Sequence, residues 1–314
     1  MTEPRSERPA RRFLHICYCC ADDAGVGAFL VDGLDMKRVM RTTDEYSSGD
    51  ILGITSDIRA PATFVYDRRG PRSSPAIEVQ GWYDPALVGE PATDPFQAGI
   101  RALGFAVPEV ETTLARLMSM GCTVVADGES PFDARHVTVL DPRNVTLELV
   151  EDSSIPAGES RIHHLRITVL DLEKSLAFYD SLGFDQIDRG TLTDAAFTGH
   201  AGEVDAEYAV LRLPDEPTAI RIVQWRSPVG HGTNYAEPFH AGIYRAALGV
   251  DDTRASYDRL REAGATFDRP PMEIVMAGTP VPGMWITFIT DPDGIPWEFV
   301  QRPRSIFRSP QPAP

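Results

Sequence analysis

Glutamate and arginine side chains on strand-like segments are the residues of this sequence best suited to chemistry. Glu298 lies in PWEFVQ, where it alternates with apolar residues and therefore projects from one face of its strand. Arg221 in TAIRIVQW and Arg245 in GIYRAALGV lie in similarly apolar segments. A guanidinium there can bind a carboxylate, phenolate or enolate of a ligand, and a neighbouring ionised glutamate can act as a weak base. The same residues could instead form a buried ion-pair cluster, which must be well paired because an isolated buried charge is costly.

Three other side chains are candidates for binding a substrate, in addition to Arg221. Cys17 follows His15 by two residues, so both project from the same face of a strand. His136 in ARHVTVLD suits either an acid–base group or a solvated histidine at a strand end, and Tyr244 suits either a pocket wall or the core. The spacing of the four cysteines does not match a zinc ribbon, and we expect buried, reduced thiols at Cys17, Cys19, Cys20 and Cys122.

The elements that position these residues repeat along the chain. PFQAGIRALGFAVPEVETTLARLMSMGCTV, from Pro95, aligns without a gap with PFHAGIYRAALGVDDTRASYDRLREAGATF, from Pro238. RFLHICYCC matches RIHHLRITV, which aligns His15 with His164. Because the match extends over most of the 314 residues, it indicates an internal duplication.

Each half contains a strand, a helix and further strands twice over, which is the pattern βαβββ. RIHHLRITV has the alternation of a strand, and LEKSLAFYDSL has the pattern of an amphipathic helix with Asp171 as N-cap and Gly183 at its C-terminal end. The segment DSSIPAGES contains helix breakers and small polar residues that are typical of a linker. We predict an N-terminal domain at residues 13–151, a linker at 152–160, a C-terminal domain at 161–302 and a disordered tail at 303–314.

The composition argues against several classes of function. With 46 acidic and 30 basic residues, the net charge of −16 opposes binding to the phosphates of nucleic acids. No apolar run reaches the roughly 18–20 residues that span a bilayer, and the basic N-terminus is not followed by a small-residue cleavage site. We therefore expect a cytoplasmic protein whose partner is a small molecule and not a nucleic acid or a membrane.

Three segments resemble a known superfamily. HHLRITVLDLEKSLAFYDSLGF, GIYRAALGVDDTRASYDRLREAG and DPDGIPWEFVQ are similar to the vicinal oxygen chelate superfamily, which includes glyoxalase I, extradiol dioxygenases, and fosfomycin and bleomycin resistance proteins. The resemblance implies an α+β fold of two tandem glyoxalase-like domains, in which paired βαβββ modules form open, cup-shaped sheets around a small-molecule pocket. By the same analogy, a divalent metal often binds in a cup and homodimers are common.

The resemblance also places candidate metal ligands on the first and last strands of the modules. The first-strand positions are His15 and His164, and the last-strand positions include Glu78, Glu148 and Glu298. If the modules pair within each half, the first half has one nitrogen and two carboxylate ligands. This set would suit Fe²⁺, Mn²⁺, Zn²⁺ or Mg²⁺, and it is our prediction for the metal site: His15, Glu78 and Glu148.

Pairing of the modules across the halves would give different sets, and the sequence does not choose between the two arrangements. The two cups would then hold His15, Glu78, Arg245 and Glu298 in one case, and Glu148, His164 and Arg221 in the other. Arg245 occupies a position where many relatives have histidine. Arginine stays protonated and cannot serve as an ordinary metal ligand.

Three hypotheses of function follow from the resemblance and these residues. The leading one is an enzyme that acts on a small oxygenated organic molecule by lyase, isomerase or ring-cleaving dioxygenase chemistry, with a divalent metal as Lewis acid. The second is metal-free catalysis, in which Arg245 stabilises an anion and His164 or Glu298 is the base. The third is a non-catalytic protein that binds or sequesters a small molecule. Metal content separates the first hypothesis from the other two.

Overall fold

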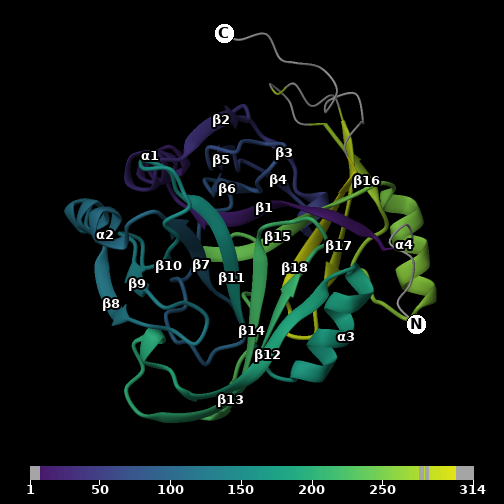
Figure 1. Cartoon of the computed structure of the whole chain (residues 1–314). Coiled ribbons are helices and arrows are strands. Elements are labelled where there is room, and N and C mark those ends of the chain that lie inside the picture. Colours follow the sequence, from purple (N-terminus) through teal and green to yellow (C-terminus); the bar gives the residue numbers. More distant parts are fainter. Residues whose placement is uncertain (1–7, 276–278, 280–282, 302–314) are drawn as a thin grey trace.

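The computed structural model describes residues 8–275, 279 and 283–301, and it contains two curved eight-stranded sheets (Figure 1). The segment 303–314, for which we predict a disordered tail, lies outside the described residues. In spatial order, the first sheet consists of β16 (Met272–Ile274), β17 (Met284–Thr290), β18 (Pro296–Gln301), β15 (Gly242–Val250), β1 (Ala10–Cys20), β6 (Ala76–Gly81), β5 (Ala62–Tyr66) and β2 (Lys37–Arg41).

The second sheet has the same layout. In spatial order, it consists of β12 (Asp185–Asp194), β13 (Glu203–Arg212), β14 (Ala219–Ser227), β11 (Arg161–Val169), β7 (Gly99–Val107), β10 (Thr146–Glu151), β9 (His136–Leu140) and β8 (Thr123–Gly128). A separate hairpin-like pair, β3 (Ser47–Ser48) and β4 (Asp57–Ile58), lies in the connection between β2 and β5. The predicted α+β class with cup-shaped sheets of paired modules is therefore confirmed.

The modules pair across the two halves of the chain. In the first sheet the first module joins the fourth where β1 runs antiparallel to β15, and in the second sheet β11 runs antiparallel to β7. Each sheet thus takes one module from each half. The predicted domain limits at residues 151 and 161 are the last residue of β10 and the first residue of β11. The division of the chain into two domains at these limits stays a prediction.

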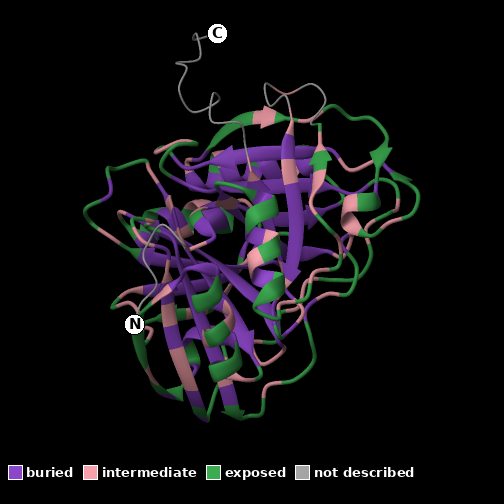
Figure 2. Ribbon diagram, turned by 90° about the vertical axis from the view of Figure 1, so that its right-hand side faces the viewer, coloured by how far each residue is buried: buried purple, intermediate pink, exposed green. Residues whose placement is uncertain are grey.

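Helices cover the outer parts of the sheets and present exposed faces to solvent (Figure 2). Helix α1 contacts β2, β5, β6 and α2, and α2 also contacts β10. Helix α3 contacts β12, β13 and β14, and α4 contacts β17 and β18. The helices are α1 (Asp23–Leu34), α2 (Val110–Ser119), α3 (Leu172–Leu182) and α4 (Thr253–Glu262), with short 3₁₀ turns η2 (Asp50–Leu52) and η3 (Ala196–Thr198).

The caps that the sequence predicts for α3 are present. The side chain of Asp171 accepts a hydrogen bond from the backbone N–H of Lys174, and Gly183 ends the helix at a φ of 112°. Asp252 caps α4 in the same way through the backbone N–H of Ala255. These side chains satisfy N–H groups that a helix start leaves without an intrahelical partner.

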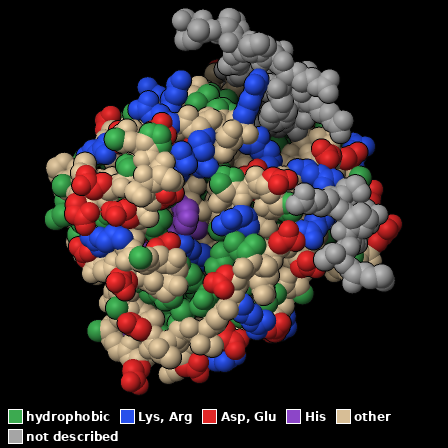
Figure 3. All heavy atoms as spheres, in the orientation of Figure 1, with side chains coloured by type: hydrophobic (Ala, Val, Ile, Leu, Met, Phe, Trp, Pro, Cys, Tyr) green, Lys and Arg blue, Asp and Glu red, His purple; other side chains and the backbone are tan. Residues whose placement is uncertain are grey.

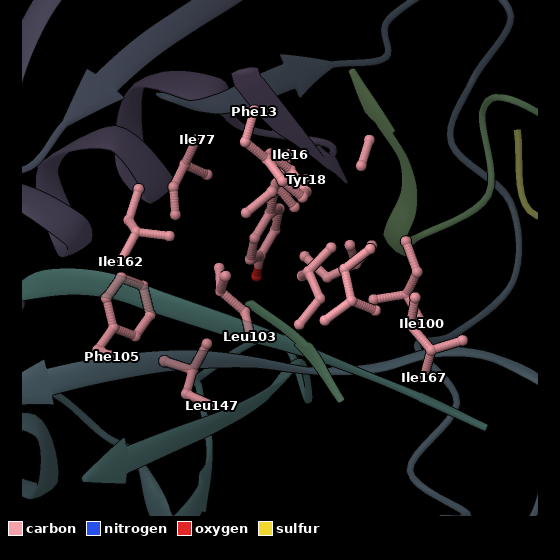
Figure 4. Packing of buried hydrophobic residues seen from close by; sticks show 14 of the residues in the cluster. Phe13, Ile16, Tyr18, Ile77, Ile100, Leu103, Phe105, Leu147, Ile162 and Ile167 are labelled. Atoms are coloured by element: carbon pink, nitrogen blue, oxygen red, sulfur yellow. The ribbon is translucent and has the colours of Figure 1, made fainter. Parts of the chain in front are cut away.

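The main core lies between the two sheets, where apolar side chains from each sheet point toward those of the other (Figure 4). The labelled side chains from the first sheet are Phe13, Ile16, Tyr18 and Ile77, and those from the second are Ile100, Leu103, Phe105, Leu147, Ile162 and Ile167. Burying each such side chain contributes about 1.5–3 kcal/mol. Because one face of each central strand is used for this core, the opposite face is left to line the cup.

The charged side chains on the face shown in Figure 3 are of both signs and intermingled, so the net negative charge is not gathered into one region there. Within the described part of the chain, no helix combines the length and apolarity needed to cross a membrane.

Asp291, in the turn between β17 and β18, has a buried carboxyl group. Burial, together with the neighbouring Asp293, raises the pKa of Asp291 to about 7 against the opposing effect of its hydrogen bonds from the Tyr179 hydroxyl and two backbone N–H groups. A carboxyl whose pKa is raised by folding binds more protons in the folded state, so stability falls as pH rises from about 4 to 7. The unfolding free energy of Asp291→Asn, relative to that of wild type, should therefore increase by on the order of 2 kcal/mol when the pH is raised from 5 to 8. Urea unfolding at both pH values measures this, and parallel pH dependences of the two proteins would contradict it.

Candidate functional site

Four neighbouring strands of the first sheet each contribute one side chain to a polar cluster in its cup. His15 comes from β1, Glu78 from β6, Arg245 from β15 and Glu298 from β18. The strand register aligns these positions, because Cys17 of β1 pairs with both Glu78 and Arg245. His15 and Glu298 are in turn both registered with one residue, Ala247.

A bulge in β1 sets the face to which His15 belongs. The register of β1 against β15 shifts between Phe13 and His15. Phe13 and Ile16 consequently both pack into the core between the sheets, whereas Leu14 packs with Met284, Ile286 and Phe288 on the cup side. His15 lies on that side too, where its ring meets Phe64 edge to face with the ring centroids 6.0 Å apart.

The four side chains are in direct contact. His15 Nε2 lies 3.3 Å from Glu78 Oε2 and 3.2 Å from Glu298 Oε2. Arg245 donates from Nη2 to Glu78 Oε2 at 2.9 Å and from Nε to Glu298 Oε2 at 3.3 Å. Its third donor, Nη1, lies 3.1 Å from Gln80 Oε1. One guanidinium therefore bridges both carboxylates and holds their oxygens around His15.

Charge and burial act in opposite directions on these groups. Burial alone would raise the pKa of Glu298, but His15 and Arg245 beside it outweigh burial and lower the pKa to about 2. Burial disfavours the charged form of Arg245, yet the anionic groups around it, with Glu78 and Glu298 among them, raise its pKa well above the ordinary value. The cluster therefore keeps a protonated arginine and an ionised Glu298.

The cluster forms the floor of a pocket with a volume of about 350 Å³. Part of its wall is apolar, with Phe64 of β5 on one side and, on the other, Met284, Ile286 and Phe288 of β17, against which Leu52 packs. A pocket with a few convergent polar groups and apolar walls has the general form of a small-molecule site.

The donor atoms fit a divalent ion. His15 Nε2 and one oxygen each of Glu78 and Glu298 lie within 4.8 Å of one another, and all three residues are buried. Ligand atoms about 2.1 Å from one ion and at right angles lie roughly 3 Å apart, close to the 3.2 and 3.3 Å separations found here. One nitrogen and two carboxylates form a mixed set that several divalent metals accept. Arg245 adds a positive charge beside the same oxygens, so an ion would bind more weakly than in a set without arginine.

The metal-site prediction is wrong in one residue. Glu148 does not lie with His15 and Glu78, because its strand, β10, belongs to the second sheet. Glu298 completes the group instead. The predicted set assumed that modules pair within a half. Pairing across the halves instead brings His15, Glu78, Arg245 and Glu298 together.

The predicted catalytic residues are likewise divided between the two sheets. Arg245 and Glu298 lie in the first cup, whereas His164 lies in the second, with its Nε2 2.7 Å from Glu148 Oε2. Burial, followed by the nearby Arg221, lowers the pKa of His164 to about 3, so its imidazole is neutral. His164 therefore cannot act on a ligand held by Arg245.

The polar side chains of the second cup are paired with one another. Glu148 also accepts a hydrogen bond from Arg166 Nε at 2.6 Å. Arg221 donates to both carboxylate oxygens of Asp133, at 2.6 and 2.9 Å. The guanidiniums of Arg221 and Arg166 lie over the rings of Phe132 and Phe197, at 4.7 and 5.8 Å from the ring centroids. Arg221 therefore forms a buried ion pair, which is one of the two roles that the sequence allows for it.

The remaining pocket candidates differ in location. His136 is buried in the second cup, where its Nε2 lies 3.1 Å from Thr138 Oγ1, so it is not a solvated strand end. Cys17 and Tyr244 are buried beside the first cup in one cluster with Trp82. The Cys17 thiol lies 3.4 Å from Gln80 Oε1. The four cysteines are free and buried, as predicted.

Sequence reasoning missed three polar residues of the two cups. Gln80 and Arg166 each follow a candidate, Glu78 and His164, by two positions, and the period of a strand would have placed them on the same face. Asp133 lies in a connection before β9, and no local pattern marks it as the partner of Arg221.

Comparison with known proteins agrees with this fold. The model of the Glyoxalase/Bleomycin resistance protein/Dioxygenase superfamily matches residues 161–299. A lactoylglutathione lyase of Schizosaccharomyces pombe is 25% identical over 224 residues, which are 67% of this chain and 68% of that protein. A probable lactoylglutathione lyase of Synechocystis sp. is 33% identical over 144 residues, which are 44% of this chain and 92% of that protein. This chain therefore belongs to the glyoxalase/bleomycin resistance protein/dioxygenase superfamily.

A solved structure matches the whole arrangement of modules. The crystal structure of glyoxalase I from Zea mays aligns with a TM-score of 0.67 and 19% sequence identity, covering 94% of this chain and 93% of that one. At this identity the match concerns the fold.

Proposed function

We propose that the pocket of the first sheet is the active site of an enzyme that transfers a proton on a small oxygenated organic molecule, in a reaction of the lyase or isomerase type. The observation that carries this proposal is the group of His15, Glu78 and Glu298, whose ligand atoms lie within 4.8 Å at the floor of a pocket of about 350 Å³. These three residues would hold a divalent metal, which when bound supplies Lewis-acid polarisation of a substrate oxygen.

The chain's own residues have separable parts in this proposal. Arg245, fixed by two carboxylates and Gln80, faces the pocket with a positive charge that stabilises negative charge developing on a substrate oxygen. Glu298 and Glu78 are the carboxylates that lie within reach of a substrate at this floor, and either can accept a proton from carbon and return it to a neighbouring atom. The apolar walls exclude water from the reacting end of the substrate.

The relatives favour the lyase type over ring cleavage. Both curated relatives are named as lactoylglutathione lyases, and one of them is matched over 92% of its length. The substrate of this chain is a separate matter, because it depends on the walls and rim of the pocket. A homodimer, common among relatives, stays a prediction.

Metal-free catalysis is the second candidate, and one observation favours it. Arg245 contacts both carboxylates that would bind the ion, so the cluster already contains a cation that compensates them. In that case Arg245 alone would stabilise the anion, with Glu298 as the base.

Metal analysis of protein purified without a chelator or an affinity tag tests the proposal. We expect about one equivalent of a divalent ion such as Fe, Mn or Zn, which is lost in His15→Ala and retained in His164→Ala, the aligned histidine of the second cup. In parallel, proton NMR in D₂O should detect exchange at the carbon beside the carbonyl in a panel of hydroxyketones and hemithioacetals. Absence of metal after reconstitution, with exchange intact, would favour the arginine-dependent reaction. Absence of both would contradict the proposed function.

A further inference from the structure

The rim of the first-sheet pocket differs in charge from its floor. One side of the rim comes from residues 42–58, a connection that contains Asp44, Glu45, Asp50 and Asp57 and no lysine or arginine. Glu45 lines the pocket together with hydroxyl groups of that connection, such as those of Tyr46 and Ser48. The opposite side contributes a second carboxylate, Glu273.

The two basic residues that flank this connection form ion pairs with other carboxylates. Arg41 and Arg59 flank the acidic connection, but Arg41 pairs with Asp23 at 2.8 Å and Arg59 with Asp44 at 2.7 Å. Neither arginine lines the pocket. Among the described residues that do line it, the carboxylates are Glu45, Glu78, Glu273 and Glu298, and the cation is Arg245 at the floor.

An apolar zone separates the two polar layers. Phe64 and Ile58 line one side of the pocket, and Met284, Ile286 and Phe288 line another, with Leu52 packed against them. A bound molecule would therefore have an oxygenated head at the floor, an apolar body in this zone and an outer end beside Glu45 and Glu273.

We propose that the substrate of this pocket has an alkyl or aromatic body and an outer end that is uncharged or cationic, and that Glu45 and Glu273 reject an anionic end. The inference rests on the proposed function and names its substrate class. An anionic end would approach two carboxylates that have no ion-pair partner among the described residues, and like charges at such a rim repel. A thiol conjugate that carries carboxylates at this end is therefore a poor substrate, in contrast to the lactoylglutathione after which the relatives are named.

One nearby cation offers the alternative against which the test is designed. Arg269 lines an adjoining pocket of about 250 Å³ together with Asp268, and the two pockets share Ile51, Leu52 and Phe288. A carboxylate end that turned into this second pocket would find Arg269 and not Glu45.

Three probes that differ only at the outer end test the proposal. They are benzohydroxamic acid and its 4-aminomethyl and 4-carboxy derivatives, whose hydroxamate offers two adjacent oxygens to the floor. Each probe is titrated calorimetrically into the metal-reconstituted full chain at low salt. The aminomethyl probe should bind most tightly and the carboxy probe most weakly, with about a fivefold to twentyfold range of Kd. Raising the salt concentration should narrow the range. The double variant Glu45→Gln/Glu273→Gln should bring the three Kd values together, whereas Asp180→Asn/Glu262→Gln, with the same change of charge outside the pocket, should leave the range unchanged.

The outcomes distinguish this inference from the proposed function. Equal affinities of the three probes for wild type would overturn the inference and leave the active-site assignment in place. Tightest binding of the carboxy probe, abolished by Arg269→Gln, would also overturn it and assign the outer end to the adjoining pocket. If none of the three probes binds, the proposed function fails, and the inference fails with it.

Discussion

Replacing Glu298 by glutamine should reduce turnover in the first-sheet pocket by about a thousandfold or more while the protein remains folded. The amide keeps the volume of the side chain and an oxygen that can accept a hydrogen bond from Arg245. It cannot accept a proton, and it removes one of the two negative charges that would hold a divalent ion between His15 and Glu78. Turnover is measured with a substrate identified in the NMR exchange panel, and circular dichroism reports on the fold.

The matched control is Glu148→Gln, which makes the same chemical change at the aligned position of the second sheet. Glu148 contacts His164 and Arg166 and lines no part of the first pocket. Its variant should retain turnover within about twofold per folded molecule, because the two clusters are separated by the core between the sheets. The opposite pattern, with turnover lost at position 148 and kept at 298, would move the active site to the second cup.

The same Glu148→Gln variant should lose about 3–5 kcal/mol of unfolding free energy. Glu148 is 1% exposed and its two oxygens are both engaged, one with His164 at 2.7 Å and one with Arg166 at 2.6 Å. Without the carboxylate, the buried guanidinium of Arg166 has no anion, and the cost of that uncompensated charge falls on the folded state. Urea unfolding at pH 7 measures the loss.

Glu111→Gln is the control for stability. Glu111 also pairs with an arginine, Arg135 at 2.9 Å, but the glutamate side chain is 63% exposed, and solvent screens the pair. Its variant should change stability far less than Glu148→Gln. Similar losses in the two variants would mean that the buried cluster of the second cup does not stabilise the fold as a buried ion pair.

Glu148 and Glu298 occupy aligned positions of the two halves, but their surroundings differ. Glu298 lies at the floor of a pocket with His15 and Arg245, whereas Glu148 is paired with Arg166, whose guanidinium lies over the ring of Phe197. The difference depends on neighbours that are distant in the sequence. Phe197 comes from η3, whereas the similar turn η2 of the first module places the aliphatic side chains of Ile51 and Leu52 along the first pocket.

Local pattern was enough for strands β11 and β18 and for the ends of α3, whereas the face to which His15 belongs also depends on the bulge in β1. The alternation in PWEFVQ and RIHHLRITV correctly indicated strands, and Asp171 and Gly183 delimit α3 as their chemistry predicts. These features depend on neighbours within a few residues, where strand period and helix capping act directly. The family resemblance added the module order, which the two sheets confirm.

The choice of partner for each module was decided by tertiary structure. β1 has one edge on β6 and can offer the other to β7 or to β15, whose sequences are similar because their segments align without a gap. Backbone hydrogen bonds of a strand edge do not distinguish such partners, so the outcome depends on how both sheets pack on their shared core. By itself the sequence determined that His15, Glu78, Glu148 and Glu298 are strand residues of the kind that line a cup. Only the packing of the two sheets decided that Glu298, and not Glu148, faces His15, because that contact joins strands from opposite ends of the chain.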